Sequence, residues 1–212
     1  MSDFGRARMA GMVGIVLGFL LVYAVGELAV VIGTSLDFGV IGPLVEIPSL
    51  ILVGYAVWLL SKLAASLRIF WFYLVGIAIP LVANLVFWTG LFTVSLVSTP
   101  VSVQVMGYFV PTVGLYGAYL IGDVLVFLSY TMIARALGYG LFRTAAIVTL
   151  AAGVMAVPTA LLVLGFDSGT AMVTIVAGFL GLASIVLQVA AFNSLATKPQ
   201  SQAPAAPAVS SA

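Results

Sequence analysis

The stretch YFVPTVGLYGAYLIGDVLVFLSYTMIARALGYGLFRTAAIVTLAAGVMAVPTALLVL (residues 108–164) contains two long apolar runs joined by a connection that carries Arg135 and Arg143. Each run exceeds the roughly 20 residues that an α-helix needs to cross the hydrocarbon core of a bilayer. Lys and Arg in short connections are held on the cytoplasmic side during insertion. The stretch therefore predicts two transmembrane helices with a cytoplasmic connection.

The same layout recurs along the chain and predicts an all-α membrane protein, a six-helix transmembrane bundle over residues 1–195. All seven Lys and Arg residues lie before the first apolar segment, between the second and third, between the fourth and fifth, or after the sixth. The other connections carry Asp37, Glu46 and Asp167 and no Lys or Arg. This asymmetry predicts a multi-pass cell-membrane protein with both its N- and C-termini in the cytoplasm. The expected helices are residues 9–33, 44–65, 69–92, 108–135, 144–164 and 171–195, and residues 196–212 are a Pro/Ala/Ser-rich tail expected to be disordered.

The sequence leaves the limits of two expected helices open. The helix 44–65 has a short purely apolar part, so Lys62 is expected to extend to the cytoplasmic surface, and Gly39, Gly42 and Pro43 are expected to break the chain before it. The alternation of Val and polar residues in 101–105 is compatible with a short extended piece or with an early start of the helix 108–135.

Composition excludes several function classes. The chain is 64% hydrophobic and 6% charged, whereas soluble domains carry about 25% charged residues, so the lipid bilayer is the expected solvent. The net charge of +1 provides no field for attracting nucleic acid. The chain has no His and no Cys, which excludes disulfides, the usual zinc sites and bis-His haem ligation. We therefore expect no catalytic residue, no cofactor and no metal site, and a protein that is not an enzyme.

Two carboxylates lie within the predicted helices. At 1.5 Å per residue, Asp123 lies about 18 Å from Arg135, near the middle of the bilayer, whereas Glu27 lies near its outer boundary. Tyr119 shares a helix face with Asp123, and Asn84 and Ser184 reach comparable depth on other helices. Because ionisable groups in a bilayer are costly, these five residues form the candidate intramembrane polar site. Either Asp123 relays protons or cations, or it is protonated and fixes helix packing by hydrogen bonding.

Small residues recur every four positions on three helices, a spacing that lets another helix approach closely. We expect these strips to pack within the bundle, with a homo-oligomer face as the less favoured alternative. The strips are Gly114, Ala118 and Gly122; Ala10, Gly14 and Gly18; and Ala177 and Gly181.

Two segments, IARALGYGLFRTA (residues 133–145) and IVLQVAAFNSL (residues 185–195), carry a resemblance to a known group. They are similar to a pattern found in archaeal multi-pass membrane proteins of unknown function. The resemblance covers the last third of the chain. It implies an origin and a fold style, and it brings no functional residue.

Two functional hypotheses follow. The first is a non-enzymatic structural or accessory component of a larger membrane assembly, with a membrane-protein partner or a second copy of the chain. The second is a small transporter or channel that uses Asp123 as its proton or cation site, with Tyr119 and Asn84 lining the path. The substrate, the partner and the oligomeric state do not follow from the sequence.

Overall fold

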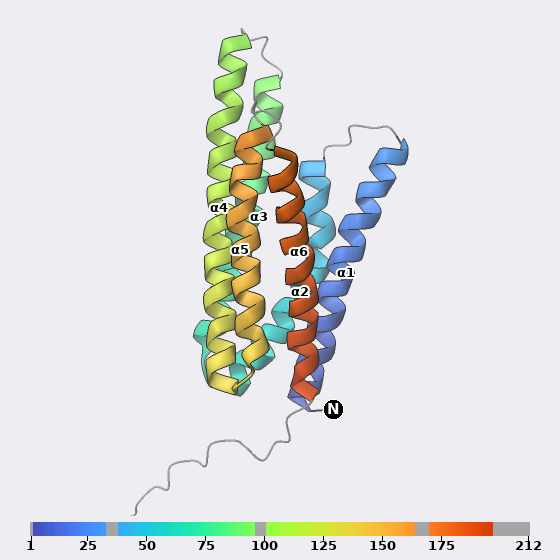
Figure 1. Ribbon diagram of the computed structural model, residues 1–212, viewed down its shortest axis with the longest axis vertical. Helices are drawn as coiled ribbons and strands as arrows, with labels where there is room; N and C mark the ends of the chain where they lie inside the picture. The colour runs from blue at the N-terminus through green and yellow to red at the C-terminus, as the bar shows by residue number, and fades with distance from the viewer. Residues whose placement is uncertain (1, 33–37, 96–100, 164–169, 197–212) are drawn as a thin grey trace, which may run out of the picture.

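The computed structural model describes residues 2–32, 38–95, 101–163 and 170–196, which lie almost entirely in α-helices (Figure 1). The predicted all-α class with six helices is confirmed. The helices are α1 (Asp3–Ile32), α2 (Phe38–Leu63), α3 (Leu67–Ser95), α4 (Val101–Leu137), α5 (Gly140–Val163) and α6 (Thr170–Asn193), and a 3₁₀ turn, η1 (Ser194–Ala196), follows α6.

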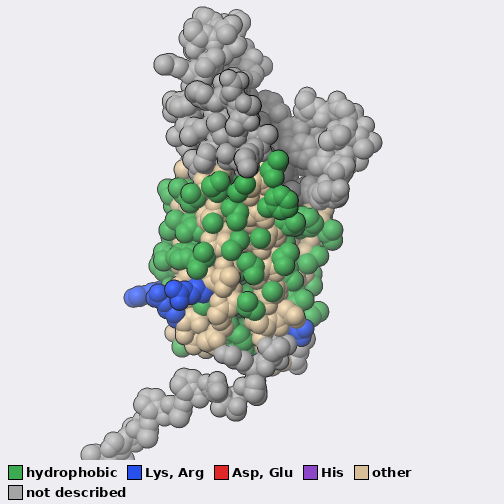
Figure 2. Space-filling view, in the orientation of Figure 1, with side chains coloured by type: hydrophobic (Ala, Val, Ile, Leu, Met, Phe, Trp, Pro, Cys, Tyr) green, Lys and Arg blue, Asp and Glu red, His purple; other side chains and the backbone are tan. Residues whose placement is uncertain are grey.

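Five of these helices, all except α5, are long and apolar enough to cross a membrane. In α5 the apolar stretch within the described residues is shorter, Gly140–Met155. Large hydrophobic side chains cover the visible face of the described bundle (Figure 2), and Phe179 and Val186 on α6 are 70% and 59% exposed. So much exposed apolar surface is stable only against lipid, and the chain is a multi-pass membrane protein.

The helices follow one another around the bundle in chain order, each antiparallel to its neighbours, and α6 packs back against α1 (Figure 1). Six described basic residues, from the start of α1 and from the α2–α3 and α4–α5 connections, lie at one end, which we call the basic end. The start of α1 and the end of α6 meet there, where the Arg8 guanidinium donates a 2.7 Å hydrogen bond to the Asn193 side-chain oxygen. The cytoplasmic orientation of this end stays a prediction.

The starts of α2 and α4 differ from the sequence-based expectation, which placed them at residues 44 and 108. Gly39, Gly42 and Pro43 lie inside α2 and do not break it, so that expectation was wrong. In lipid each backbone group needs an internal hydrogen bond, so a helix continues through Gly and Pro where water would let it end. The helix α4 starts at Val101, so the alternative of an early helix start is confirmed. Its 37 residues span about 55 Å, and α4 extends beyond its neighbours away from the basic end (Figure 1).

The two connections at the basic end have the same form. Ala65 and Gly138 both have positive φ, 51° and 71°. Four residues after each of them, an amide donates a 3.2 Å bond to the carbonyl three residues earlier, Ile69 to Ser66 and Phe142 to Tyr139. Each pair of equivalent positions is separated by 73 residues, and Ile69 and Phe142 are both fully buried. The α2–α3 and α4–α5 connections therefore share the same backbone conformation at these equivalent positions.

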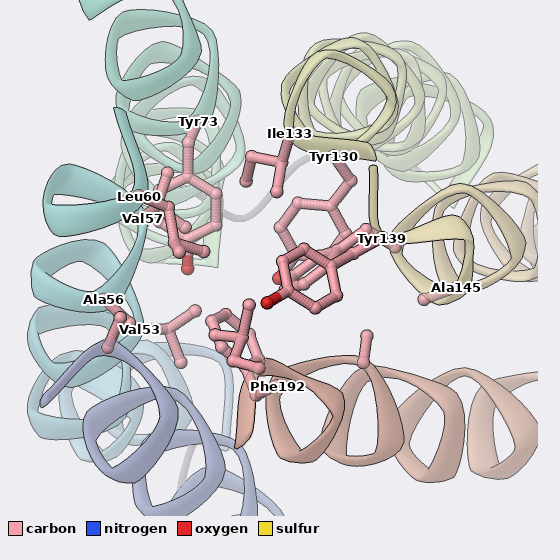
Figure 3. Close-up of a cluster of buried hydrophobic side chains, with 14 of the residues drawn as sticks. Val53, Ala56, Val57, Leu60, Tyr73, Tyr130, Ile133, Tyr139, Ala145 and Phe192 are labelled. Carbon is pink, nitrogen blue, oxygen red and sulfur yellow. The ribbon is translucent and has the colours of Figure 1, made fainter. Parts of the chain in front are cut away.

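The bundle core sits near the basic end, and a cluster of aromatic rings lies among its aliphatic side chains (Figure 3). The Tyr130 ring is stacked on that of Tyr73, at a centroid distance of 6.3 Å, and meets Phe142 and Phe192 edge-on. Phe142 and Phe192 meet each other edge-on at 5.1 Å. Such ring pairs stabilise a core beyond the area that they bury, and here they join α3, α4, α5 and α6.

Candidate functional site

The structure joins Asn84 on α3 to Tyr119 on α4. The Asn84 side-chain amide donates a 2.6 Å hydrogen bond to the Tyr119 hydroxyl, and Asn84 is buried. Both residues stand sixteen positions from a basic residue, Arg68 and Arg135. They therefore share a level about 24 Å from the basic end, in the far half of a roughly 30 Å hydrocarbon core.

Asp123 lies one helical turn closer to the basic end than Tyr119, and it is half-buried. Its carboxylate lies against the backbone of Gly153 on α5, where any side chain on Gly153 would collide with it. Asp123 is close enough to Tyr119 for the two to interact electrostatically. Because Gly153 has no side chain, the Asp123 carboxylate fits between α4 and α5.

Ser184 belongs to a different polar group nearer the basic end. Its hydroxyl lies 2.6 Å from that of Thr149 on α5 and accepts a 3.0 Å bond from the Gln188 amide. The same amide donates to Thr149 at 3.2 Å, and the Gln188 oxygen accepts from the Tyr130 hydroxyl at 3.3 Å. This polar network links α4, α5 and α6 directly above the aromatic core, and no described contact joins it to Asp123.

The remaining carboxylates lie farther from the basic end. Glu27 lies on α1, and its side chain is outside the part of the chain whose side chains the structure describes. Glu46, which the sequence analysis counted with a connection although the expected helix 44–65 includes it, lies inside α2 and is half-buried. Like Asn84 and Tyr119, it stands sixteen residues from the basic end, counted from Lys62, and it interacts electrostatically with Tyr119. The structure therefore gathers Glu46, Asn84, Tyr119 and Asp123 in the half of the bundle away from the basic end.

The small-residue strips behave differently from one another. Gly14 and Gly18 lie against Val53 and Ser49 of α2, and the Ser49 hydroxyl donates a 2.7 Å bond to the Gly14 carbonyl. Gly122 lies against the backbone of Gly76 on α3. Packing within the bundle is confirmed at these positions. Gly114 and Gly181, by contrast, have open space where a side chain would stand.

Sequence reasoning missed Glu46 and the network residues Gln188 and Thr149. One signal in the sequence could have located Glu46. Glu46, Asn84 and Tyr119 each stand sixteen residues from a basic residue, and this equal spacing puts them at the same depth on three consecutive helices. No spacing in the sequence singles out Gln188 and Thr149, because polar residues of this kind occur on many helix faces. Within the described ranges, no group of three or more His, Cys, Asp or Glu side chains is placed to hold a metal ion.

Comparisons with known proteins add no family to this geometry. No protein-family model matches the sequence, no curated protein matches it, and no solved structure matches the fold. The likeness to archaeal membrane proteins therefore rests on the two quoted segments alone, and neither the archaeal origin nor the family is supported by any of the three comparisons.

Proposed function

We propose that the protein is a non-enzymatic structural or accessory component of a membrane assembly. The observation that carries the proposal is the use of the polar side chains for holding helices together. Asn84 bonds Tyr119 across α3 and α4, Ser49 bonds the α1 backbone, and the Gln188 network joins three helices. Asp123 fills the space beside Gly153. Buried polar groups used in this way act as interhelical packing contacts.

The packing near the basic end supports the same proposal. The rings of Tyr73, Tyr130, Phe142 and Phe192 interlock across the middle of the bundle, and the largest fully buried side chains of the described residues are found there. A conducting path through the bundle would have to pass this aromatic layer. A scaffold needs no such path, and rigid packing suits it.

The Asp123→Asn variant tests the proposal in proteoliposomes. With a potassium-diffusion potential imposed and a pH-sensitive dye inside, wild-type vesicles should show no proton flux above protein-free vesicles. Asp123→Asn should leave that result unchanged and should alter the free energy of unfolding by less than about 1 kcal/mol, because Asn has nearly the same size and shape as Asp and fits the same space beside Gly153. Wild-type flux that disappears in a folded Asp123→Asn variant would contradict the proposal.

The accessory role also predicts a partner. After gentle detergent extraction from its native membrane, the protein should migrate in a particle heavier than its own 22.0 kDa and the bound detergent. The same chain produced in an unrelated host, without its partner, is the control and should migrate as a smaller particle. A monomer from both sources would argue against the accessory role.

One observation favours a small transporter or channel as the second candidate. Tyr119 interacts electrostatically with both Glu46 and Asp123, at a depth where the described chain has no Lys or Arg. A phenol that interacts electrostatically with two carboxylates offers groups that can pass protons or cations. The flux measurement decides between the two candidates, since only this one requires flux that depends on Asp123.

A further inference from the structure

A pocket of about 280 Å³ opens on the side of the bundle, between α1, α2 and α6. Near the basic end α1 and α6 are in contact, where Phe192 packs on Gly11, and toward the other end α1 leans away from α6 (Figure 1). The pocket lies above this contact, and its exposed rim residue Phe19 belongs to the lipid-facing surface. Its lining consists of Gly18, Phe19, Glu46, Ser49, Leu50 and Ile185.

The chemistry of this lining is apolar around one acid. Phe19, Leu50 and Ile185 provide hydrophobic walls from three helices. The hydroxyl of Ser49 is already engaged with the Gly14 carbonyl at 2.7 Å, which leaves Glu46 as the ionisable group of the pocket. A pocket with apolar walls and a single placed charge is typical of a site for a small organic molecule.

The position of Glu46 gives the charge of that molecule. The carboxylate stands about 24 Å from Lys62, the nearest basic residue on its own helix. The other described Lys and Arg residues also lie at the basic end. A charged acid within the hydrocarbon core is costly unless it is protonated or meets a cation. A neutral lipid chain would leave the carboxylate uncompensated, and an inorganic divalent ion needs several oxygen ligands that this lining does not offer.

We propose that this pocket binds a small lipophilic organic cation, an ammonium group on an apolar body. The ammonium pairs with Glu46, and the apolar body lies against Phe19, Leu50 and Ile185. The ligand arrives from the bilayer through the opening between α1 and α6. This binding site does not involve Asp123 and does not depend on the proposed scaffold role.

The test measures binding of radiolabelled trimethyl(4-phenylbutyl)ammonium to the purified, full-length protein in lipid nanodiscs. Its neutral isostere, with a tert-butyl group in place of the trimethylammonium, is measured beside it. Wild-type protein should bind the cation at least tenfold more tightly than the isostere. Glu46→Gln should remove that preference and change the affinity for the isostere less than twofold, which also shows that the variant keeps its pocket.

Two matched variants complete the design. Asp123→Asn removes the other described intramembrane carboxylate, which lies outside the pocket, and should leave cation binding unchanged. Ile185→Trp fills the pocket and should weaken both ligands about equally. The proposal is overturned if Glu46→Gln still prefers the cation, if Asp123→Asn loses the preference to the same extent, or if Ile185→Trp binds both ligands as wild type does.

Discussion

The half of the bundle at the basic end and the half away from it are built differently. Near the basic end, aromatic rings from four helices interlock (Figure 3), and connections of three and two residues close the hairpins. Away from it, the described residues include half-buried carboxylates, an open side pocket and glycines that no neighbour approaches. In lipid the hydrophobic effect does not force helices together, so packing and hydrogen bonds decide where a bundle is tight. The half at the basic end is thus held together mainly by buried rings, whereas the half away from it also relies on interhelical contacts of polar side chains.

The largest test of this contrast compares two phenylalanines on α6. Phe192 is fully buried among rings at the basic end, whereas Phe179 is 70% exposed in the other half. Phe192→Ala should lower the free energy of unfolding by about 3–5 kcal/mol, because it leaves a cavity beside Phe142 and Tyr130. Phe179→Ala should lower it by less than about 0.5 kcal/mol. Reversible unfolding in mixed micelles measures both, and equal effects would contradict the contrast.

A second test uses two glycines on the same face of α4. Gly122 lies against the α3 backbone at Gly76 and beneath the Pro80 ring, whereas Gly114 has open space around it. Gly122→Leu should cost about 1–3 kcal/mol, because overpacking separates α3 from α4. Gly114→Leu is the control on the same helix and should be close to neutral. A costly Gly114→Leu would mean that α4 is packed as tightly at Gly114 as it is at Gly122.

The smallest effects are expected in the two hairpin connections at the basic end. Gly138 has a φ of 71°, where an alanine is strained, so Gly138→Ala should destabilise the bundle by about 1 kcal/mol. Ala65 occupies the equivalent position with a φ of 51°, so Ala65→Gly should relieve strain and stabilise by up to about 1 kcal/mol. Thermal unfolding of the two variants should therefore shift in opposite directions, and shifts of the same sign would show that the two connections are not equivalent.

Much of the fold was accessible from the sequence, because helix length and the positions of Lys and Arg carry strong physical constraints. Arg135 and Arg143 correctly marked a hairpin, and their spacing placed it within a few residues of its observed limits. The start of α2 was missed because Gly39 and Pro43 end helices in water and not in lipid. Breaker residues are therefore a poor guide to helix ends at the membrane boundary.

The candidate polar site was accessible only in part. Depth follows from counting residues along a helix, and Asn84 and Tyr119, which the count places at comparable depth, are hydrogen-bonded. The count places Ser184 at a similar depth, but Ser184 lies nearer the basic end and bonds with Thr149 and Gln188. Which helices are neighbours also had to come from the structure, and that knowledge places Glu46 beside the α1–α6 opening.

The contact between Arg8 and Asn193 has a consequence for how the protein is put together. The helices form a ring that is closed where the start of α1 meets the end of α6, through the side chains of these two residues. A short linker across that contact would permit new ends to be cut at another connection, as in a circular permutation. The sequential order in which the segments leave the ribosome is then only one of several that lead to the same neighbours.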